Sequence, residues 1–458
     1  MENIKSSDAV GPPRERFTVE ALAQVLTAEL ALTPDVPLCV AYSGGMDSHV
    51  LLYALAALRA HAPWRVTALH VDHALQAPSA QWQRHCAEVC AALDVPYRSE
   101  RVSVDGIGDY GLEDAARRVR YLALARLLPP GAVLLTAHHQ DDQAETLLLQ
   151  LVRGAGVQGL AAMPAIAPFA TGRLARPLLG FARAALAAYA GERQLRWIED
   201  ASNQEVRLGR NFLRHRVMSV LAQRWPHAPE AIARAARHQA QAARLLEEIA
   251  REDLAAALDE EGGLAISRVL LLSPERQANL VRHWVRANGV SAPSEPVLRQ
   301  ILARLRSDPQ TRHATVAWAN VEARRYRDRL TLRVAVPDVA DDWEAAWEPG
   351  AALVIPGAPW QLRAQPAIGA GVSRACIAGK TLRVRLRRGG ERCLLRGHHH
   401  KVKKLLQEAG VPPWERARLP LLYVDDDLAA IGDRWVCEPY GARADEPGLV
   451  LVLERLIG

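Results

Sequence analysis

The chain alternates short apolar runs with longer segments whose apolar positions recur three and four residues apart. An apolar run at 37–42 is followed by the turn SGGMDS at 43–48 and by helical spacing at 49–59. Further strands are expected at 65–71 and 132–137, and further helices at 17–31, 79–93, 112–128 and 141–153. A continuous apolar run bounded by turn residues is typical of a buried strand, so this alternation predicts an α/β fold with a doubly wound, mostly parallel sheet.

The pattern changes after Pro177, where helical spacing dominates. Helices are expected at 180–194, 211–223 and 229–259, and a mixed region at 264–335 ends in an arginine-rich hairpin. Residues 337–380 hold many Pro, Gly, Asp and Trp residues without a clear period, which is typical of a linker with short strands. We therefore predict four parts: an α/β domain at 17–225, a helical and mixed domain at 226–336, a linker at 337–380 and a small α+β domain at 381–458.

Composition narrows the class of protein. With 49% hydrophobic and 24% charged residues over 458 positions, the chain reads as a globular protein of several domains. No apolar stretch approaches the ~18 residues that span a bilayer and the first residues lack the apolar core of an export signal, so we expect no membrane partner and a cytoplasmic location. The formal charge of +6 allows a polyanionic partner. The six cysteines include no C-x-x-C pair, so we expect reduced packing residues and no zinc ribbon.

The turn after the first apolar run carries the strongest chemical signal. Gly44 and Gly45 let backbone amides approach a ligand closely, and the following helix directs its unpaired N–H groups to the same point, so the turn predicts a phosphate cradle. The loop G-x-x-x-x-G-K-[ST] is absent, and no lysine occurs between residues 5 and 380. The turn resembles the pyrophosphate loop of the ATP pyrophosphatases. This resemblance implies ATP and Mg²⁺ as cofactors, with Asp47 as the metal ligand and ATP bound by Ser43, Gly44, Gly45, Met46, Asp47 and Ser48.

Two further segments are expected beside this loop. His70 and Asp72 end the next strand, and ligands of doubly wound sheets collect at the carboxyl ends of strands. Related enzymes receive the adenine at that edge. In the helix at 112–128, Arg117 shares a face with Tyr121, and with lysine absent an arginine must compensate the triphosphate. A surface ion-pair helix is the alternative interpretation of that segment.

An acidic turn opens the helix at 141–153. Asp142 and Glu145 lie three residues apart and are neighbours on that helix. Paired carboxylates can hold an ammonium group and accept its proton, which an incoming amine nucleophile requires. Acidic residues also stabilise a helix start by offsetting its dipole, so this pattern alone leaves both interpretations open.

Several later segments favour the chemical interpretation. They read RGAGVQGL at 153–160, RPLL at 176–179, WIEDASN at 197–203 and RNFLRH at 210–215. Together with the pyrophosphate loop and the acidic turn, this series resembles the tRNA(Ile)-lysidine synthase family over nearly the whole chain. The segment HALQ at 73–76 departs from that family, where a basic residue is expected soon after the leucine.

The resemblance implies a two-step reaction on the wobble cytidine of the isoleucine tRNA with a CAU anticodon. ATP adenylates the C2 oxygen of the base and releases pyrophosphate, and the ε-amine of free L-lysine then displaces AMP to give lysidine. The residues implied as catalytic are Asp47, Arg117, Asp142, Glu145 and Arg210. The two carboxylates would take the lysine ammonium and Arg210 its carboxylate, with Asn211 and Arg214 beside them. The number of subunits is left open, with a homodimer as one form.

A basic tract near the carboxyl end, RGHHHKVKK at 396–404, lies in a segment that resembles the family's terminal tRNA-binding domain. We expect the tract to open a helix and to contact tRNA phosphates, which supply affinity without reading sequence. The residues expected to do so are Arg396, Lys401, Lys403 and Lys404. A solvated run of charges is the alternative interpretation.

Two other functions are weighed against this one. A pyrophosphate-loop enzyme that thiolates tRNA bases would need reactive cysteines, whereas Cys86 and Cys90 have the wrong spacing and fall on a predicted helix. A catalytically silent RNA-binding protein of the same fold would be expected to lack Asp47, Asp142 or Glu145, and all three are present.

Overall fold

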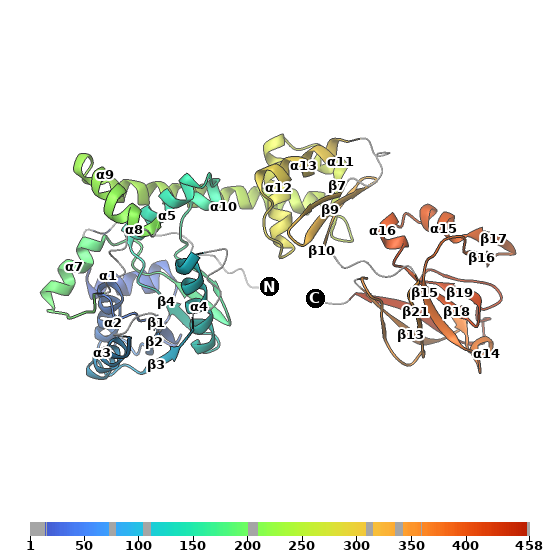
Figure 1. Cartoon of the computed structure of the whole chain (residues 1–458), viewed down its shortest axis with the longest axis horizontal. Helices are drawn as coiled ribbons and strands as arrows, with labels where there is room; N and C mark the ends of the chain where they lie inside the picture. Colours follow the sequence, from blue (N-terminus) through green and yellow to red (C-terminus); the bar gives the residue numbers. More distant parts are fainter. Residues whose placement is uncertain are drawn as a thin grey trace. The chain divides into compact units, whose positions relative to one another are not determined.

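The chain forms two compact units, Met1–Ile249 and Ala250–Gly458, whose elements are drawn in Figure 1. The computed structural model describes residues 14, 16–72, 79–103, 111–199, 209–307, 315–334, 342–358 and 360–455. The HALQ segment at 73–76 and positions 200–203 of the WIEDASN segment lie outside these ranges. Within them, no helix combines the length and apolar character needed to cross a membrane.

The first unit is built on a six-stranded sheet with the order β3-β2-β1-β4-β6-β5. Its strands are β1 (Leu38–Ala41), β2 (Val66–Asp72), β3 (Tyr97–Arg101), β4 (Val133–Leu135), β5 (Ile166–Phe169) and β6 (Gly172–Ala175). All neighbouring pairs are parallel except β5 with β6. The predicted doubly wound, mostly parallel sheet is confirmed. Its strand order reverses between β1 and β4, which is the position where sheets of this kind bind ligands.

The helices pack on this sheet through two separate hydrophobic clusters. Leu38 and Val40 of β1 belong to one cluster, which also holds residues of α1 (Val19–Gln24), α2 (Met46–Leu58), α3 (Ser79–Ala92) and α7 (Arg183–Glu192). Cys39 of β1 belongs to the other, with Leu124 of α4 (Gly111–Leu127). Because successive strand residues point to opposite faces, β1 is apolar throughout when both faces are covered.

The other helical segments lie before, between and after the strands of this sheet along the chain, and the last of them runs into the second unit. They are the π-helical segment η1 (Val25–Glu29), α5 (Gln140–Val152), α6 (Val157–Leu160), α8 (Gly209–Phe212), the π-helical segment η3 (Leu213–Met218), α9 (Ser219–Arg224) and α10 (Ala228–Ala257). The helix predicted at 211–223 is therefore a continuous run of α8, η3 and α9. Its widened central turn is of the kind often found at functional sites.

The second unit begins with a small mixed domain. Helices α11 (Ile266–Val269), α12 (Pro274–Ala287) and α13 (Glu295–Arg306) share a core with a four-stranded sheet of order β7-β10-β9-β8. Its strands are β7 (Leu264–Ala265), β8 (Thr315–Trp318), β9 (Val321–Tyr326) and β10 (Arg329–Val334). Strands β9 and β10 pair as the arginine-rich hairpin that the sequence predicts.

The segment expected to be a linker at 337–380 is instead part of the carboxyl-terminal fold. It contains β11 (Glu344–Ala346), β12 (Leu353–Val354), β13 (Trp360–Ile368), β14 (Val372–Ser373) and α14 (Arg374–Ile377). Strand β11 pairs with β15 (Leu382–Leu386), and β13 pairs along its whole length with β21 (Pro447–Arg455). A domain boundary at 381 would cut through both sheets. The partner of β13 lies far along the chain, so no local pattern could reveal the pairing.

The basic tract also differs from its expected form, because its first half is a strand. Strands β16 (Arg392–Leu395) and β17 (His398–Lys401) form a hairpin, and only then does α15 (Val402–Glu408) begin. The rest of the domain comprises α16 (Pro413–Arg416), β18 (Pro420–Val424), β19 (Asp427–Ile431) and β20 (Trp435–Val436). Cys393 and Cys437 form a disulfide, with Cα atoms 5.4 Å apart, so the expectation of reduced cysteines is wrong for this pair.

Candidate active site

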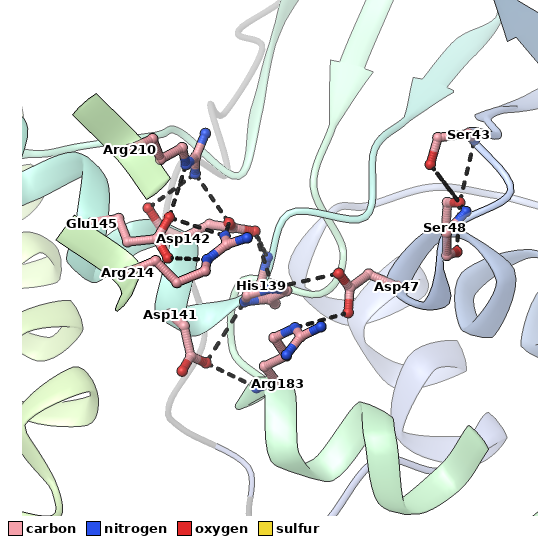
Figure 2. Close-up of polar contacts among 11 residues, drawn as sticks. Ser43, Asp47, Ser48, His139, Asp141, Asp142, Glu145, Arg183, Arg210 and Arg214 are labelled. Atoms are coloured by element: carbon pink, nitrogen blue, oxygen red, sulfur yellow. Dashed lines mark hydrogen bonds and ion pairs between the residues drawn. The ribbon is translucent and has the colours of Figure 1, made fainter. Parts of the chain in front are cut away.

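The loop after β1 is held in shape by its own serines. The Ser43 and Ser48 hydroxyls lie 3.0 Å apart, and the Ser48 hydroxyl donates to the Gly45 carbonyl oxygen at 3.0 Å. The Ser43 backbone N–H donates to Ser48 Oγ at 3.3 Å. Figure 2 shows these serines beside Asp47, in the first turn of α2. Hydrogen bonds within the protein therefore hold the loop in shape, with the amino end of a helix behind it.

The two glycines of the loop serve different purposes. Gly44 has φ +83°, and a Cβ atom there would lie 2.8 Å from Cys86 Sγ and 3.0 Å from Ile198 Cδ1. The Gly44 carbonyl oxygen also accepts a hydrogen bond from the Ile198 backbone N–H at 3.0 Å. A Cβ at Gly45 would meet only Ser43 Oγ, at 3.6 Å. Gly44 is thus required by packing inside the protein, whereas the protein leaves room for a side chain at Gly45.

This difference gives a test of ligand approach. We expect Gly45→Ala to leave the thermal unfolding midpoint nearly unchanged and to raise the KM for ATP by about tenfold to a hundredfold, because the new methyl group stands where phosphate would approach. Gly350→Ala is the matched control, since Gly350, like Gly45, has no left-handed φ, and no atom lies within 4 Å of its Cβ position. A Gly45→Ala enzyme with wild-type KM for ATP would contradict the phosphate cradle.

Asp47 has an oxygen without a hydrogen bond. Among the described residues, no hydrogen-bonding partner reaches its buried Oδ1 atom, and the Arg183 Nε lies 3.9 Å from that oxygen. Burial raises the pKa of this carboxyl, while His139 and Arg183 act in the opposite direction. Among the described residues, no group of three or more His, Cys, Asp or Glu side chains could hold a metal. Mg²⁺ commonly takes one or two carboxylates plus substrate phosphates, so Asp47 fits the cation of a nucleotide and not a metal site made wholly of protein ligands.

His139 lies between Asp47 and the start of α5 (Figure 2), and the sequence analysis did not single it out. Its side chain is 2% exposed, and Nε2 lies 3.7 Å from Asp47 Oδ2 and 3.4 Å from Asp142 Oδ2. Its backbone N–H donates to Asp142 Oδ2 at 2.9 Å. The only signal in the sequence was its position, between a strand end and an acidic turn.

The predicted acid pair is joined by two arginines. Arg210 Nε donates to Glu145 at 2.8 Å and its Nη2 to Asp142 at 3.0 Å, while Arg214 Nε donates to Glu145 at 2.7 Å and its Nη2 to Asp142 at 3.1 Å. Asp142, Glu145, Arg210 and Arg214 are called the carboxylate–arginine cluster below (Figure 2). Burial works against the ionised form of Asp142, but His139 and Arg210 outweigh it and lower the pKa of Asp142 to about 2. Asp142 is therefore ionised at neutral pH.

Each carboxylate of the cluster keeps capacity for another donor. Asp142 accepts three hydrogen bonds, from His139 N–H, Arg210 and Arg214. Glu145 accepts three, one from Arg210 and two from Arg214. An ionised carboxylate can accept about four. An ammonium group could thus join the cluster through both acids without displacing either arginine.

The other predicted residues of the first unit lie at the end of β2, in the core and in α8. His70 is 6% exposed, and its Nδ1 donates to the Tyr42 carbonyl oxygen at 2.9 Å, while burial lowers its pKa. Asp72 is 7% exposed and lies 3.7 Å from Arg101 Nε. Met46 packs in the core, so only its backbone could face a ligand. Asn211 is buried beside Arg210 in α8.

Arg117 and the basic tract complete the set. The Arg117 guanidinium stacks over Tyr121, with 5.0 Å between its Cζ and the ring centroid. In the second unit, three lysines of the tract are exposed, and Lys404 Nζ lies 3.7 Å from Glu408. Arg396, with a φ of +49°, turns the hairpin, and its backbone N–H donates to Glu438 at 2.7 Å.

Models of known protein families match three regions of the chain. Family models match as a PP-loop domain over 18–221, a TilS substrate binding domain over 264–331 and a TilS substrate C-terminal domain over 382–453. The tRNA(Ile)-lysidine synthase of Alkalilimnicola ehrlichii is 43% identical over 446 residues, covering 97% of this chain and 98% of that protein. The chain belongs to the tRNA(Ile)-lysidine synthase family.

Another tRNA(Ile)-lysidine synthase, from Coxiella burnetii, is 39% identical over 434 residues, covering 94% of this chain and 96% of that protein. Among solved structures, a U34-tRNA thiolase from Methanococcus maripaludis superposes with a TM-score of 0.40 at 16% identity, covering 48% of this chain and 77% of that one. That likeness is too low to bear on function. The assignment of this chain to the tRNA(Ile)-lysidine synthase family therefore rests on sequence similarity over nearly its full length.

Proposed function

We propose that the protein uses ATP to adenylate the wobble cytidine of the isoleucine tRNA with a CAU anticodon and then joins free L-lysine to C2 of that base. A carbonyl oxygen of the base is a poor leaving group, and its conversion to an AMP ester makes attack by an amine feasible. The observation that carries the proposal is the adjacency of two sites. The phosphate loop follows β1 and the carboxylate–arginine cluster follows its neighbour β4, with His139 between Asp47 and Asp142.

The nucleotide site is proposed at the loop. The backbone amides around Gly44 and Gly45 and the amino end of α2 would bind phosphate oxygens, while Ser43 and Ser48 hold the loop in shape. His70 and Asp72, at the end of the neighbouring β2, would line the adenine side. Asp47 would hold Mg²⁺, which screens the triphosphate and stabilises the charge that develops on the leaving pyrophosphate.

The lysine site is proposed at the carboxylate–arginine cluster. With a pKa of about 2, Asp142 is suited to hold an ammonium group and is a weak acceptor of its proton. Arg210 and Arg214 would keep both acids ionised and oriented, with Asn211 packed beside them. This changes the role first given to Arg210, because its guanidinium is already engaged by Glu145 and Asp142.

A labelled-lysine assay tests the proposed function directly. Purified protein with ATP, Mg²⁺, labelled lysine and the isoleucine tRNA transcript is expected to incorporate label, and methionine tRNA is expected neither to accept label nor to compete effectively. Omission of ATP should abolish incorporation. A reaction that requires a sulfur donor and leaves lysine free would contradict the proposal. The assembly, for which a homodimer stays a prediction, is measured separately by sedimentation.

Free cysteines near the loop argue against sulfur transfer. Cys86 lies against Gly44 of the loop, although the sequence placed it only on a helix further along the chain. Burial raises the pKa of Cys86 to about 12 and that of Cys90 to about 11. Sulfur transfer needs thiolates, and both thiols are protonated at neutral pH. These cysteines therefore support lysine ligation over thiolation.

The basic tract is proposed to bind tRNA phosphates. Replacement of Lys401, Lys403 and Lys404 by alanine is expected to weaken tRNA binding and to reduce the slope of log affinity against log salt by about 2 to 3, because each phosphate contact contributes nearly one. Lys380→Ala is the control, since Lys380 pairs with Asp425 in the same domain. A triple variant with the wild-type salt slope would refute the assignment.

A truncation should be made before residue 342, because a cut at 381 removes the partners of β11 and β13.

A further inference from the structure

Both arginines of the carboxylate–arginine cluster are already paired with its own carboxylates. Its two carboxylates face two guanidinium groups, and every one of those contacts is an ion pair of 2.7–3.1 Å. Free lysine carries a carboxylate, and both ATP and tRNA carry phosphates, so the reaction needs further positive charge that the protein itself does not neutralise. That charge must be sought outside the cluster.

Arg176 meets this requirement. It stands directly after β6, at the same carboxyl edge of the sheet as the turn after β4. Its Nη1 donates to the Pro164 carbonyl oxygen at 2.7 Å, which fixes the guanidinium, and its buried Nε has no hydrogen-bonding partner among the residues that the structure describes. In the described part of the chain, no ion pair joins Arg176 or Arg117 to a carboxylate, in contrast to Arg210 and Arg214.

The surroundings of Arg176 keep two positive charges close together. Burial and the nearby charge of Arg117 both lower the pKa of Arg176. Tyr121 contacts both arginines: its hydroxyl oxygen accepts a hydrogen bond from Arg176, and its ring stacks against the Arg117 guanidinium. Phe169 fixes that ring from the side, at 5.8 Å between centroids. Two rigid guanidinium groups without an acid are disfavoured unless an anion binds, and their planar forks match an oxyanion.

His138 connects this pair to the lysine site. Its Nδ1 lies 2.8 Å from Thr136 Oγ1, and burial lowers its pKa to about 3, so the ring is neutral. Asp142, Arg210, Arg176 and Arg117 all lie within electrostatic reach of this ring. An anion held by Arg176 would therefore lie near the carboxylates proposed for the ammonium.

We propose that Arg176, together with Arg117, forms an oxyanion-binding subsite of the active site. The inference rests on the proposed function, since the oxyanion it names is either the carboxylate of lysine or a phosphate of ATP or tRNA. Removal of a guanidinium that hydrogen-bonds a charged ligand weakens the binding of that ligand by about tenfold to a hundredfold.

Three variants test the subsite. Arg176→Gln removes the charge, Arg176→Lys keeps the charge without the fork, and Arg173→Gln removes an exposed arginine from β6 as the matched control. For each we would measure the KM for lysine and for ATP, the tRNA affinity against salt, and the preference for lysine over cadaverine, which has the same amine chain without the carboxylate. Thermal unfolding identifies variants that fail to fold, and Arg176→Lys decides if Arg176→Gln does not fold.

The outcomes are distinguishable. We expect Arg176→Gln to weaken one anionic substrate by about tenfold to a hundredfold, Arg176→Lys to be intermediate, and Arg173→Gln to match wild type. A raised KM for lysine with a reduced preference over cadaverine assigns the carboxylate. If the preference for lysine over cadaverine is unchanged, a raised KM for ATP shows that the subsite binds a phosphate of ATP. A smaller salt slope for tRNA then shows that it binds a phosphate of tRNA. A folded Arg176→Gln enzyme with all of these values at wild type overturns the subsite. Failure of the wild-type enzyme to incorporate lysine would instead overturn the proposed function.

Discussion

A Glu145→Gln enzyme is expected to adenylate tRNA at close to the wild-type rate and to transfer lysine about tenfold to a hundredfold less efficiently. The substitution keeps the shape of the side chain and removes a charge that would hold the lysine ammonium. Glu145 contacts Arg210 and Arg214 and neither Asp47 nor the loop, so the first step should be spared. Pyrophosphate release without lysine measures the first step, and labelled-lysine incorporation into isolated adenylated tRNA measures the second.

Two further variants sharpen this result. Asp142→Asn should show the same loss in the second step, with a lower unfolding temperature, because the depressed pKa of Asp142 means that its ionised form stabilises the fold at neutral pH. Glu88→Gln is the control, since this carboxylate is exposed on α3 and lies outside the cluster. If Glu145→Gln slows pyrophosphate release as much as lysine transfer, the assignment of Glu145 to lysine is wrong.

An Asp47→Asn enzyme is expected to lose both steps, with pyrophosphate release reduced on the order of 10³-fold or more, because the metal-assisted departure of pyrophosphate would lose its protein carboxylate. Stability should change in the opposite direction to activity. Burial raises the pKa of Asp47, so its ionisation opposes folding at neutral pH, and the amide is expected to unfold at an equal or higher temperature. The measurements are pyrophosphate release over a Mg²⁺ titration and a thermal unfolding curve.

The control for Asp47 is a carboxylate far from any site. Asp94 is fully exposed, so Asp94→Asn should leave both activity and unfolding unchanged. Pyrophosphate release by Asp47→Asn at the wild-type rate and the wild-type Mg²⁺ requirement would remove Asp47 from the metal site. A marked fall in its unfolding temperature would show a structural role that the buried Oδ1 atom, without a hydrogen bond from any described residue, does not suggest.

The sequence was informative wherever a signal is local. The apolar runs at β1, β2 and β4 and the helices beside them could be read from periodicity, because both faces of those strands are covered. Strand β3 was missed because it is a mostly exposed strand at the sheet edge, and so carries no apolar run. The loop at 43–48 was recognisable because a close backbone approach to phosphate requires glycine whatever surrounds it.

What the local pattern could not provide was pairing between distant segments. Glu145 meets Arg210 and Arg214 across 65 and 69 residues, and Cys393 meets Cys437 across 44. Strand β13 likewise pairs with β21, which lies far along the chain. This is why a region without a period was mistaken for a linker. Two carboxylates on a helix start predict either a dipole effect or an ammonium site. Only the packing of α8 and η3 against α5 reveals that arginines already share them.

The chain by itself determined the α/β class, the phosphate loop and the acid pair, because each depends on residues adjacent in sequence and on the backbone geometry they allow. Tertiary structure alone decided that Asp142 stays ionised, that His139 lies between two sites and that no carboxylate of the described residues pairs with Arg176, because charge and burial at a point are set by every segment that packs around it.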